Sequence, residues 1–425
     1  MSRRPSKRRK QKSLAAEMSL WIDRLNASGK GMAGDVAVPF TLPGEEVRAR
    51  VSGNEGQLLS IETVSSKRIA PPCPHFGQPG DNCGGCQTQH MDLAASLKWK
   101  EERLLATLSR MGMALPKPTL YQVQPRTRRR AKFALALKGQ QWVMGFRERR
   151  SHRIIPLREC LVVHPDIFSS AVQLREAAFS LFPEGTKEVE AFFTLTDGGV
   201  DLDLQGLDEA NLDLSTREAL ADYSVQADLC RLTLNGEPFI LRWPPNVQID
   251  DLSISLPPSG FLQATRSAQN FLQQIVYTGL ADARHIADLF CGLGTFAIPL
   301  SKNTQVQAFD GEVRAITALQ KAVGSTGRPL LASKRDLFQR PLLPDELATF
   351  DGAVLDPPRA GAKAQMEALS QSSIPTIVMV SCNLATLARD LKFLSDRYHM
   401  TDLYLVDQFL WSPHIEIVAV LKYQP

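Results

Sequence analysis

The segment DLFCGLGTF, residues 288–296, decides the fold. It lies where an apolar run ends and a helical pattern begins, so we expect a turn between a strand and a helix. The closely spaced Gly292 and Gly294 would let a cofactor approach the backbone at the carboxyl edge of a sheet. A third glycine and a Walker lysine are missing, which disfavours the usual dinucleotide and ATP sites.

Beyond Pro258, short apolar strands alternate with helical patterns, which predicts a parallel, doubly wound sheet. The predicted strands are residues 286–290, 306–310, 352–356 and 377–381. Asp310 ends the second strand, where its carboxylate could accept hydrogen bonds from ribose hydroxyls, and Asp336 follows a third. An acid near the end of each successive strand is the layout of class I methyltransferases. We therefore expect a Rossmann-like methyltransferase domain over residues 256–425.

The segment LDPPRA, residues 355–360, follows one of these strands. The Asp-Pro-Pro sequence suggests methylation of an adenine amino group, in which the prolines hold the acid beside the base. Those enzymes need an aromatic residue next, to stack on the base, but here Arg359 and Ala360 follow. This departure argues against adenine as the target.

Cys382 ends the strand 377–381, and Glu416 stands just before the last apolar run of the chain. Uracil C5 is too weak a nucleophile to attack a methyl sulfonium, but addition of a thiolate to C6 makes C5 enolate-like. A base must then remove the C5 proton, and Glu416 is the natural choice. An ordinary thiol pKa is near 8.5, so Cys382 needs positive or dipolar help to react. Cys291, in the cofactor turn, is the rival nucleophile but is expected to pack, as is Cys230.

The chain has seven cysteines and no export signal, so metal or catalytic use explains them better than a disulfide framework does. Cys73, Cys83 and Cys86 lie in a loop rich in Gly, Pro, Asn and Asp, and Cys160 follows at a distance. Thiolates bind zinc and iron–sulfur clusters. Structural zinc more often shows two tight pairs, whereas a cubane accepts one distant fourth ligand. Both metals stay open at this point.

Positive charge is unevenly distributed along the chain. Residues 1–12 carry seven basic side chains and no acid, and residues 121–160 carry eleven against two acids. The two segments together have a net charge of +16, so the remainder sums to −12. Such segregation favours a polyanionic partner, since clustered Lys and Arg gain from counterion release. No stretch resembles a membrane span or a secretory signal, so we expect a cytoplasmic protein without a membrane partner.

The chain is too long for a single core, and we expect a multidomain α/β protein. The expected parts are a disordered basic tail at 1–17, a small β-barrel at 18–66, a discontinuous β-rich α+β domain at 67–93 and 121–255 that carries the cysteine cluster, a helical linker at 94–120, and the domain at 256–425.

These motifs together resemble the RNA 5-methyluridine methyltransferase family from about residue 20 onward. Residues 29–45 resemble a TRAM domain, an RNA-binding barrel, and CGGCQ at 83–87 resembles part of a [4Fe–4S] site. GFLQ at 260–263, DPPRAGA at 356–362, SCN at 381–383 and HIE at 414–416 match further motifs of the family. The resemblance implies Cys382 as nucleophile and Glu416 as base. It implies S-adenosylmethionine contacts from Gln263, Phe290, Gly292, Thr295, Asp310, Asp336 and Asp356, and cluster ligation by Cys73, Cys83, Cys86 and Cys160.

Two departures from the family pattern stand out. Asp310 occupies a position where Glu is common, and the stretch 409–413 before His414 is divergent. The resemblance implies an RNA partner, with ribosomal RNA favoured over transfer RNA, and we expect a monomer.

Three rival functions differ in their sequence requirements. An RNA 5-methylcytosine enzyme would usually show a Pro-Cys nucleophile motif, which is absent. A radical S-adenosylmethionine enzyme needs a tight CxxxCxxC motif, which is also absent. An iron–sulfur RNA-binding protein that has lost catalysis would not need Cys382 and Glu416, both of which are present.

Overall fold

The computed structural model describes residues 16–77 and 82–424. Most of the expected disordered tail, residues 1–17, lies outside the described residues. The chain divides into two compact units. The first comprises residues 1–82, 86–99 and 411–413, and the second comprises 83–85, 100–410 and 414–425.

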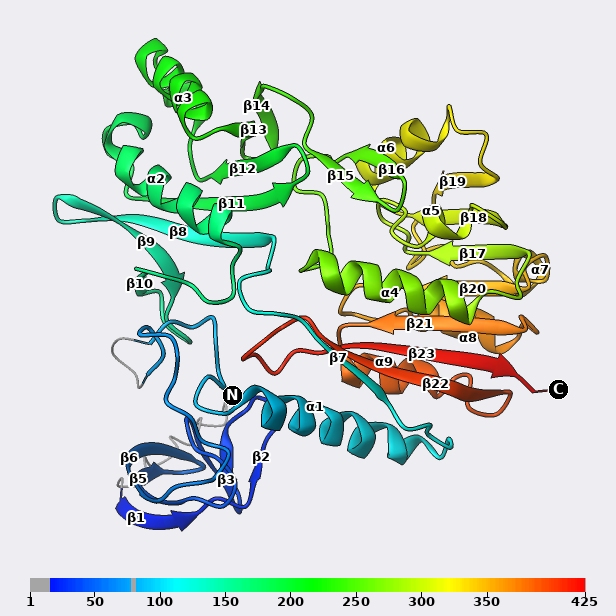
Figure 1. Cartoon of the computed structure of the whole chain (residues 1–425), viewed down its shortest axis with the longest axis horizontal. Helices are drawn as coiled ribbons and strands as arrows, with labels where there is room; N and C mark the ends of the chain where they lie inside the picture. The colour runs from blue at the N-terminus through cyan, green and yellow to red at the C-terminus, as the bar shows by residue number, and fades with distance from the viewer. Residues whose placement is uncertain (1–15, 78–81, 425) are drawn as a thin grey trace, which may run out of the picture. The chain divides into compact units, whose positions relative to one another are not determined.

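The first unit is built on a six-stranded sheet with the order β1-β5-β6-β4-β3-β2 (Figure 1). Its strands are β1 (Ala16–Trp21), β2 (Arg24–Leu25), β3 (Gly31–Ala33), β4 (Val36–Val38), β5 (Glu46–Ser52) and β6 (Glu55–Thr63). Burial alternates along β5, so Val47 and Ala49 face the core while Arg48 and Arg50 face outward toward Glu17. The predicted β-rich character of this region is confirmed, whereas its likeness to a TRAM barrel stays a prediction.

The second unit contains a seven-stranded sheet with the order β10-β9-β8-β11-β12-β13-β14. Its strands are β8 (Arg130–Lys138), β9 (Gln141–Arg147), β10 (Ile154–Pro156), β11 (Glu188–Thr196), β12 (Gly199–Gln205), β13 (Leu229–Leu234) and β14 (Glu237–Leu241). Helices α2 (Pro165–Leu181) and α3 (Leu214–Gln226) pack on it, and Pro165 and the N-cap His164 fix the start of α2. Turn η2 (Glu209–Asn211) precedes α3.

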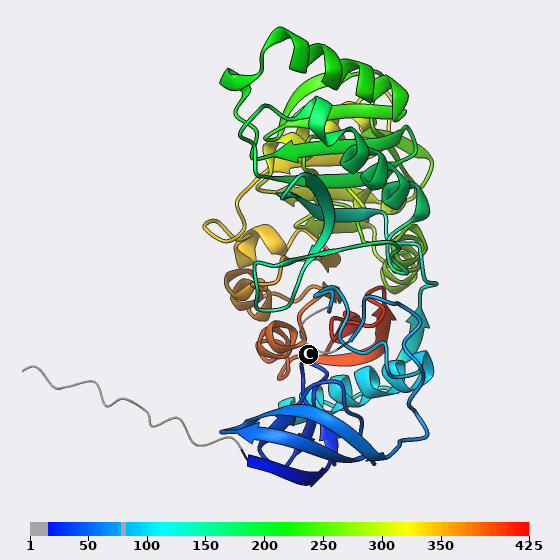
Figure 2. The same cartoon turned by 90° about the vertical axis from the view of Figure 1, so that its left-hand side faces the viewer.

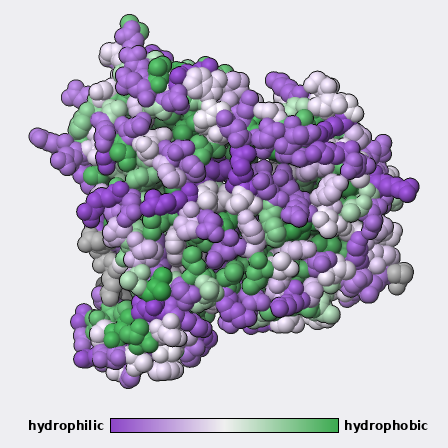
Figure 3. All heavy atoms as spheres, viewed as in Figure 1, coloured by the Kyte–Doolittle hydropathy of each residue, from purple (hydrophilic) through white to green (hydrophobic). Residues whose placement is uncertain are grey.

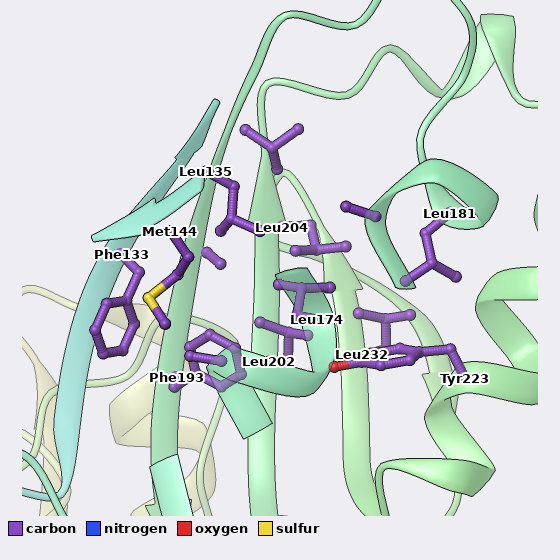
Figure 4. Packing of buried hydrophobic residues seen from close by; sticks show 14 of the residues in the cluster. Phe133, Leu135, Met144, Leu174, Leu181, Phe193, Leu202, Leu204, Tyr223 and Leu232 are labelled. Atoms are coloured by element: carbon purple, nitrogen blue, oxygen red, sulfur yellow. The ribbon is translucent and has the colours of Figure 1, made fainter. Parts of the chain in front are cut away.

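The hydrophobic core of this part lies between the sheet and α2 (Figure 4). Leu174 of α2 packs among Leu202 and Leu204 of β12, with the ring of Phe193 from β11 beside them. All four side chains are almost fully buried, and burying each contributes about 1.5–3 kcal/mol. The core is thus a sheet with one face covered by helices, which agrees with the predicted β-rich α+β character of this region.

The second unit also contains an eight-stranded sheet with the order β19-β18-β17-β20-β21-β23-β22-β7. Its strands are β7 (Thr119–Gln122), β17 (His285–Leu289), β18 (Gln305–Asp310), β19 (Leu330–Lys334), β20 (Gly352–Leu355), β21 (Thr376–Ser381), β22 (Tyr398–Asp407) and β23 (Glu416–Tyr423). The first five in this order are parallel, β23 is antiparallel to β21 and β22, and β7 is parallel to β22.

Helices cover both faces of this sheet. Figures 1 and 2 show α4 (Arg266–Gly279) on one face and α8 (Lys363–Ser370) and α9 (Leu384–Leu391) on the opposite one. The remaining elements are α1 (Leu93–Leu108), η1 (Ser109–Met111), α5 (Ala297–Leu300), α6 (Val313–Val323), α7 (Pro344–Leu347) and the hairpin of β15 (Asn246–Ile249) and β16 (Leu252–Ser255). The four strands predicted after residue 258 are confirmed to within one residue, and so is the doubly wound arrangement.

Two findings were not expected from the sequence. The segment predicted as a helical linker, 94–120, supplies the start of edge strand β7 as well as helix α1. In addition, the ammonium group of Lys100 lies 2.6 Å from the Asp407 carboxylate at the end of β22, and both side chains are essentially inaccessible to solvent. Within the described residues no helix is long and apolar enough to cross a membrane. Figure 3 shows polar side chains over most of the visible face of the second unit, with apolar residues in small groups between them.

Candidate active site

One edge of the eight-stranded sheet gathers the residues predicted to be functional. The parallel strands β17, β18, β20 and β21 all end there, and Phe290, Asp310, Asp356 and Cys382 lie at or just beyond these ends. Because β23 runs antiparallel to β21, its first residue, Glu416, lies at the same edge. In doubly wound sheets ligands bind at this edge.

Cys382 and Glu416 occupy opposed positions on neighbouring strands. Ser381 pairs with Ile417 in the β21–β23 register, and continuing that register by one residue sets Cys382 across from Glu416. Side chains at directly opposed positions have Cβ atoms about 4.5–5.5 Å apart. A nucleophile and a base at this spacing could act on adjacent atoms of one ring.

The loop after β21 is tied to the loop after β20. Asn383, the N-cap of α9, accepts a hydrogen bond from the Ala385 amide and donates one of 3.0 Å to the Arg359 carbonyl. Gly361 has φ +76°, and a Cβ atom there would lie 2.4 Å from both Arg389 and Asp390. The glycine therefore allows the loop after β20 to approach helix α9 closely, and the Asn383 hydrogen bond sets the Arg359 carbonyl beside the residue that follows Cys382.

The electrostatics of the site favour protonated acids. Burial, followed by the negative charges of Glu416 and Asp356, raises the pKa of Cys382 to about 11, while Arg359 opposes these effects. Burial also raises the pKa of Glu416 to about 8, assisted by the negative charge of Asp356. The pKa of Asp356 is raised to about 7 by burial, against a hydrogen bond from Gln263. Arg359 and the N-terminus of α9 supply the expected positive help, but in this state burial and the two carboxyls outweigh it.

Gln263 lies in the loop before α4 and contacts two of these groups. Its amide nitrogen donates to Asp356 at 3.1 Å, and its amide oxygen accepts from Gln408 at 3.0 Å. Gln408 also donates to Glu416 at 3.0 Å. The sequence did not single out Gln408, because it is one polar residue next to another, Asp407, at the end of a strand that is itself partly polar.

Arg129 forms hydrogen bonds to the backbone of the loop that carries Gln263. Its guanidinium donates to the Gln263 carbonyl at 3.0 Å and to the Gln269 side chain at 2.6 Å, and its amide donates to the Ala264 carbonyl. Arg129 is only 4% exposed, so it cannot contribute to a surface charge as the sequence had suggested. Composition alone cannot distinguish a buried arginine from the exposed arginines around it in a basic segment.

The predicted cofactor turn adopts a tight conformation. Phe290 has φ +66° and Gly292 has φ +53°, and the amide of Gly292 donates to the Asp310 carboxylate at 2.9 Å. The turn after β19 places the Phe338 ring 5.4 Å from that of Phe290, and Asp336 caps the Phe338 amide at 2.9 Å. The partly buried ring of Phe290 and the exposed ring of Phe338, beside a carboxylate, form a surface that suits an adenine ring and a ribose.

Several residues in and around this turn are buried or hydrogen-bonded within the fold. Thr295 lies in the turn before α5, and its carbonyl accepts a hydrogen bond from Gln273 of α4. Asp288 is fully buried, and its pKa is raised well above the usual range by burial and by the nearby Asp356 and Asp310. Cys291 and Cys230 are both buried, as expected of packing cysteines. Burial raises the pKa of both thiols, as it does that of Cys382, but these two differ from the partly exposed Cys382 in that a substrate base cannot reach them.

The basic segment 121–160 is partly neutralised in the folded chain. Lys132 and Arg147 pair with Glu190 of β11, and Arg147 also pairs with Glu188. Near the Gln263 loop, the guanidinium of Arg130 lies 5.4 Å from the ring centre of Phe261, which is 65% exposed. The cationic surface closest to the candidate site is thus carried by fewer residues than the sequence count implied.

The four predicted cluster ligands are divided between the units. Cys73 and Cys86 belong to the first unit and Cys83 and Cys160 to the second, where both pack partly buried against the central core. Among residues 16–77 and 82–424, no three His, Cys, Asp or Glu side chains are grouped so as to hold a metal ion. Metal ligation therefore stays a prediction from the sequence.

Comparison with known proteins decides the family. An RNA methyltransferase of Rhizobium meliloti is 38% identical over 410 residues, which cover 94% of this chain and 98% of that protein. A 23S rRNA (uracil(1939)-C(5))-methyltransferase of Halomonas elongata is 31% identical over 99% of this chain and 92% of its own length. Residues 339–424 match the family model described as tRNA (Uracil-5-)-methyltransferase. The chain belongs to the S-adenosylmethionine-dependent RNA uracil-C5 methyltransferases.

This chain has the same fold as a solved RNA uracil-C5 methyltransferase. The tRNA (uracil-54, C5)-methyltransferase of Pyrococcus abyssi, solved with S-adenosyl-L-homocysteine, superimposes with a TM-score of 0.73. The match covers 95% of this chain and all of that one at 21% sequence identity, so it bears on the fold alone. The β-rich N-terminal region and the C-terminal methyltransferase fold are thus both shared with a member of the family.

Proposed function

We propose that this RNA methyltransferase modifies C5 of a uridine through a covalent bond between Cys382 and C6, with Glu416 as the base. The observation that carries the proposal is the register of β21 and β23, which sets the two side chains across from each other at the ligand edge of the sheet. Asp356 and Arg359, on the adjoining loop, act on the charge of both.

The reaction proceeds in three steps. The Cys382 thiolate adds to C6, and the electrons of the C5–C6 double bond move toward O4. C5 then takes the methyl group that S-adenosylmethionine supplies. Glu416 finally removes the C5 proton, the double bond re-forms, and the C6–sulfur bond breaks to release the thiolate. A base whose pKa is raised to about 8 is well matched to proton removal near neutral pH.

The thiol must lose its proton before the first step. Its pKa of about 11 means that the side chain is neutral in this state. Asp356, whose pKa is raised to about 7, is the group that receives this proton, which leaves Glu416 unprotonated for the last step. The cofactor would lie against Phe290, Gly292, Thr295, Asp310 and Asp336, with Gln263 and Asp356 toward the reacting end, as the family resemblance implies.

RNA would be held at the surface around Phe261 and Arg130. An exposed aromatic ring beneath a guanidinium offers a face on which an unstacked base can lie, and single-stranded RNA is recognised in this way. The Halomonas relative favours 23S rRNA as the substrate, and tRNA is the alternative.

We also propose a [4Fe–4S] cluster bound by Cys73, Cys83, Cys86 and Cys160. The support for it is the spacing of these cysteines in the sequence and the affinity of thiolates for iron–sulfur clusters. No step of the reaction involves it. Iron and acid-labile sulfide analysis of protein purified without oxygen tests it, with a Cys160→Ser variant expected to lose the metal and a Cys230→Ser variant expected to keep it.

The experiment that tests the function is nucleoside mass spectrometry. Unmodified 23S rRNA and tRNA transcripts are incubated separately with the protein and labelled S-adenosylmethionine, and labelled 5-methyluridine is expected in one of them. Cys382→Ala abolishes the label while RNA binding persists, and Glu416→Gln accumulates a denaturation-resistant RNA–protein adduct. Labelled 5-methylcytosine, or turnover by Cys382→Ala, would overturn the proposal.

A further inference from the structure

We propose that Gln408 is a positioning residue that holds the Glu416 carboxyl and the Gln263 side chain in one hydrogen-bonded chain reaching Asp356. The inference rests on the proposed role of Glu416 as the base and adds a residue that the motifs of the sequence do not include. Gln408 follows the last residue of β22, is 3% exposed, and uses every polar atom of its amide.

The orientation of the Gln408 amide is determined by its backbone partner. The amide N–H of Ala264 can only donate, and it lies 3.1 Å from the Gln408 Oε1 atom. The Nε2 group must therefore point the other way, where it donates to Glu416 Oε2 and Gln263 Oε1, each at 3.0 Å. The two donors of this group are both used.

The same reasoning fixes Gln263. Its oxygen accepts from Gln408, so its nitrogen faces Asp356 and donates to that carboxylate at 3.1 Å. One backbone amide thus sets the orientation of two glutamines and delivers one donor to each of two carboxyls. Glutamines with the opposite orientation would face both carboxyls with oxygen atoms, which is unfavourable at these distances.

Neighbouring structure keeps Gln408 in place. The preceding residue, Asp407, accepts from Lys100, Gln122 and the Phe409 amide. On the other side, Arg129 donates to the Gln263 carbonyl next to Ala264. The backbone next to Gln408 and the backbone of Gln263 are therefore each held by a buried side chain from another element, Lys100 through Asp407 and Arg129 directly.

The contact has an electrostatic consequence for Glu416. The charged or titratable groups that act on this carboxyl are Asp356 and Arg359 after β20 and Cys382 after β21. Asp356 and burial raise its pKa, whereas the Gln408 hydrogen bond and Arg359 lower it. Removal of the Gln408 donor leaves the raising effects less opposed, so Glu416 should lose its proton at a higher pH.

The test compares Gln408→Met with the wild type in the release of the methylated adduct. Methionine keeps the length and volume but donates no hydrogen bond. We expect the midpoint of the release rate to move up by about one pH unit, which means a rate about tenfold lower below both midpoints and a difference of less than about twofold well above them. Gln408→Glu, which keeps an acceptor for Ala264 but adds a carboxyl, should shift the midpoint further and serves if the methionine variant does not fold.

Gln365→Met is the matched control. Gln365 is equally buried and uses its amide on the backbone of Leu342, away from the sheet edge. This control should keep the pH profile of the wild type whatever its effect on stability. A Gln408 variant whose rate falls equally at every pH, or whose midpoint stays in place, overturns the proposal.

A second readout separates this inference from the proposed function. The carbon-13 signal of the Glu416 carboxyl, identified by its loss in Glu416→Gln, reports the pKa without any RNA. An upward shift in Gln408→Met supports the positioning role even if no RNA is methylated, and an unchanged titration refutes it even if methylation is observed.

Discussion

The raised pKa of the Cys382 thiol can be tested directly by removing the charge opposite it. In Glu416→Gln the side chain keeps its shape but can no longer become negative. The wild-type pKa of about 11 has burial as its first cause and the Glu416 charge as its second, so the variant should titrate lower.

The magnitude follows from the strand register. Charges about 5–6 Å apart, as expected for opposed side chains, interact by about 3 kcal/mol at an effective dielectric constant of about 20. That energy equals about two pKa units, and partial exposure of the thiol reduces it, so we expect a decrease of about one to two units.

The assay is alkylation of Cys382 by iodoacetamide at a series of pH values, followed by mass spectrometry of the peptide. Only the thiolate reacts, so the rate gives the midpoint directly. Glu367→Gln is the control, because it makes the same chemical change on an exposed residue that pairs with Lys363. If Glu416→Gln and the control titrate together, the carboxyl is not close enough to Cys382 to act on its protonation, and the assignment of the base fails with it.

Three further outcomes are expected. Lys100→Met should lower the free energy of unfolding by about 3–5 kcal/mol, because it leaves the Asp407 carboxylate buried without its partner. Chemical denaturation measures this change, and an unchanged free energy would mean that the pair is exposed to water. The raised pKa of Asp288 contributes stability that is present below the unfolded-state pKa and is lost as the pH rises through the folded-state pKa. The melting temperature of Asp288→Asn should therefore fall less than that of the wild type between pH 5 and pH 9, and equal decreases in the two proteins would contradict a protonated Asp288. Phe261→Ala should weaken binding of unmodified RNA by about tenfold, the value of one base stacked on an aromatic ring, whereas equal affinity would place the RNA elsewhere.

The parts of the site that the sequence predicted are those fixed by local patterns. Cys382 and Asp356 each follow a short apolar run, and parallel strands bring such ends to one edge. Glu416 was predicted as a residue before a strand, but its place opposite Cys382 depends on β23 lying between β21 and β22, which no local pattern encodes.

The parts that were missed depend on contacts between distant segments. Arg129 looked like any other residue of a basic run, yet it is buried against residues more than a hundred positions later. Gln408 acquires its role only when the loop before α4 meets the end of β22. Composition counted charges correctly but could not show that Lys132 and Arg147 would be paired with acids from β11.

The pairing of strand β7 affects how this chain folds during synthesis and which fragments of it can fold. Residues Thr119–Gln122 pair with Tyr404–Asp407, so the catalytic sheet takes its last strand from a segment nearly three hundred positions earlier in the chain. A fragment that starts at residue 256 would expose the backbone groups of β22 and invite association with other chains. During synthesis the sheet can be completed only when nearly the whole chain has left the ribosome, and such long-range pairing slows folding. The methyltransferase part is therefore not a detachable module, and a minimal active fragment must retain the segment that carries β7.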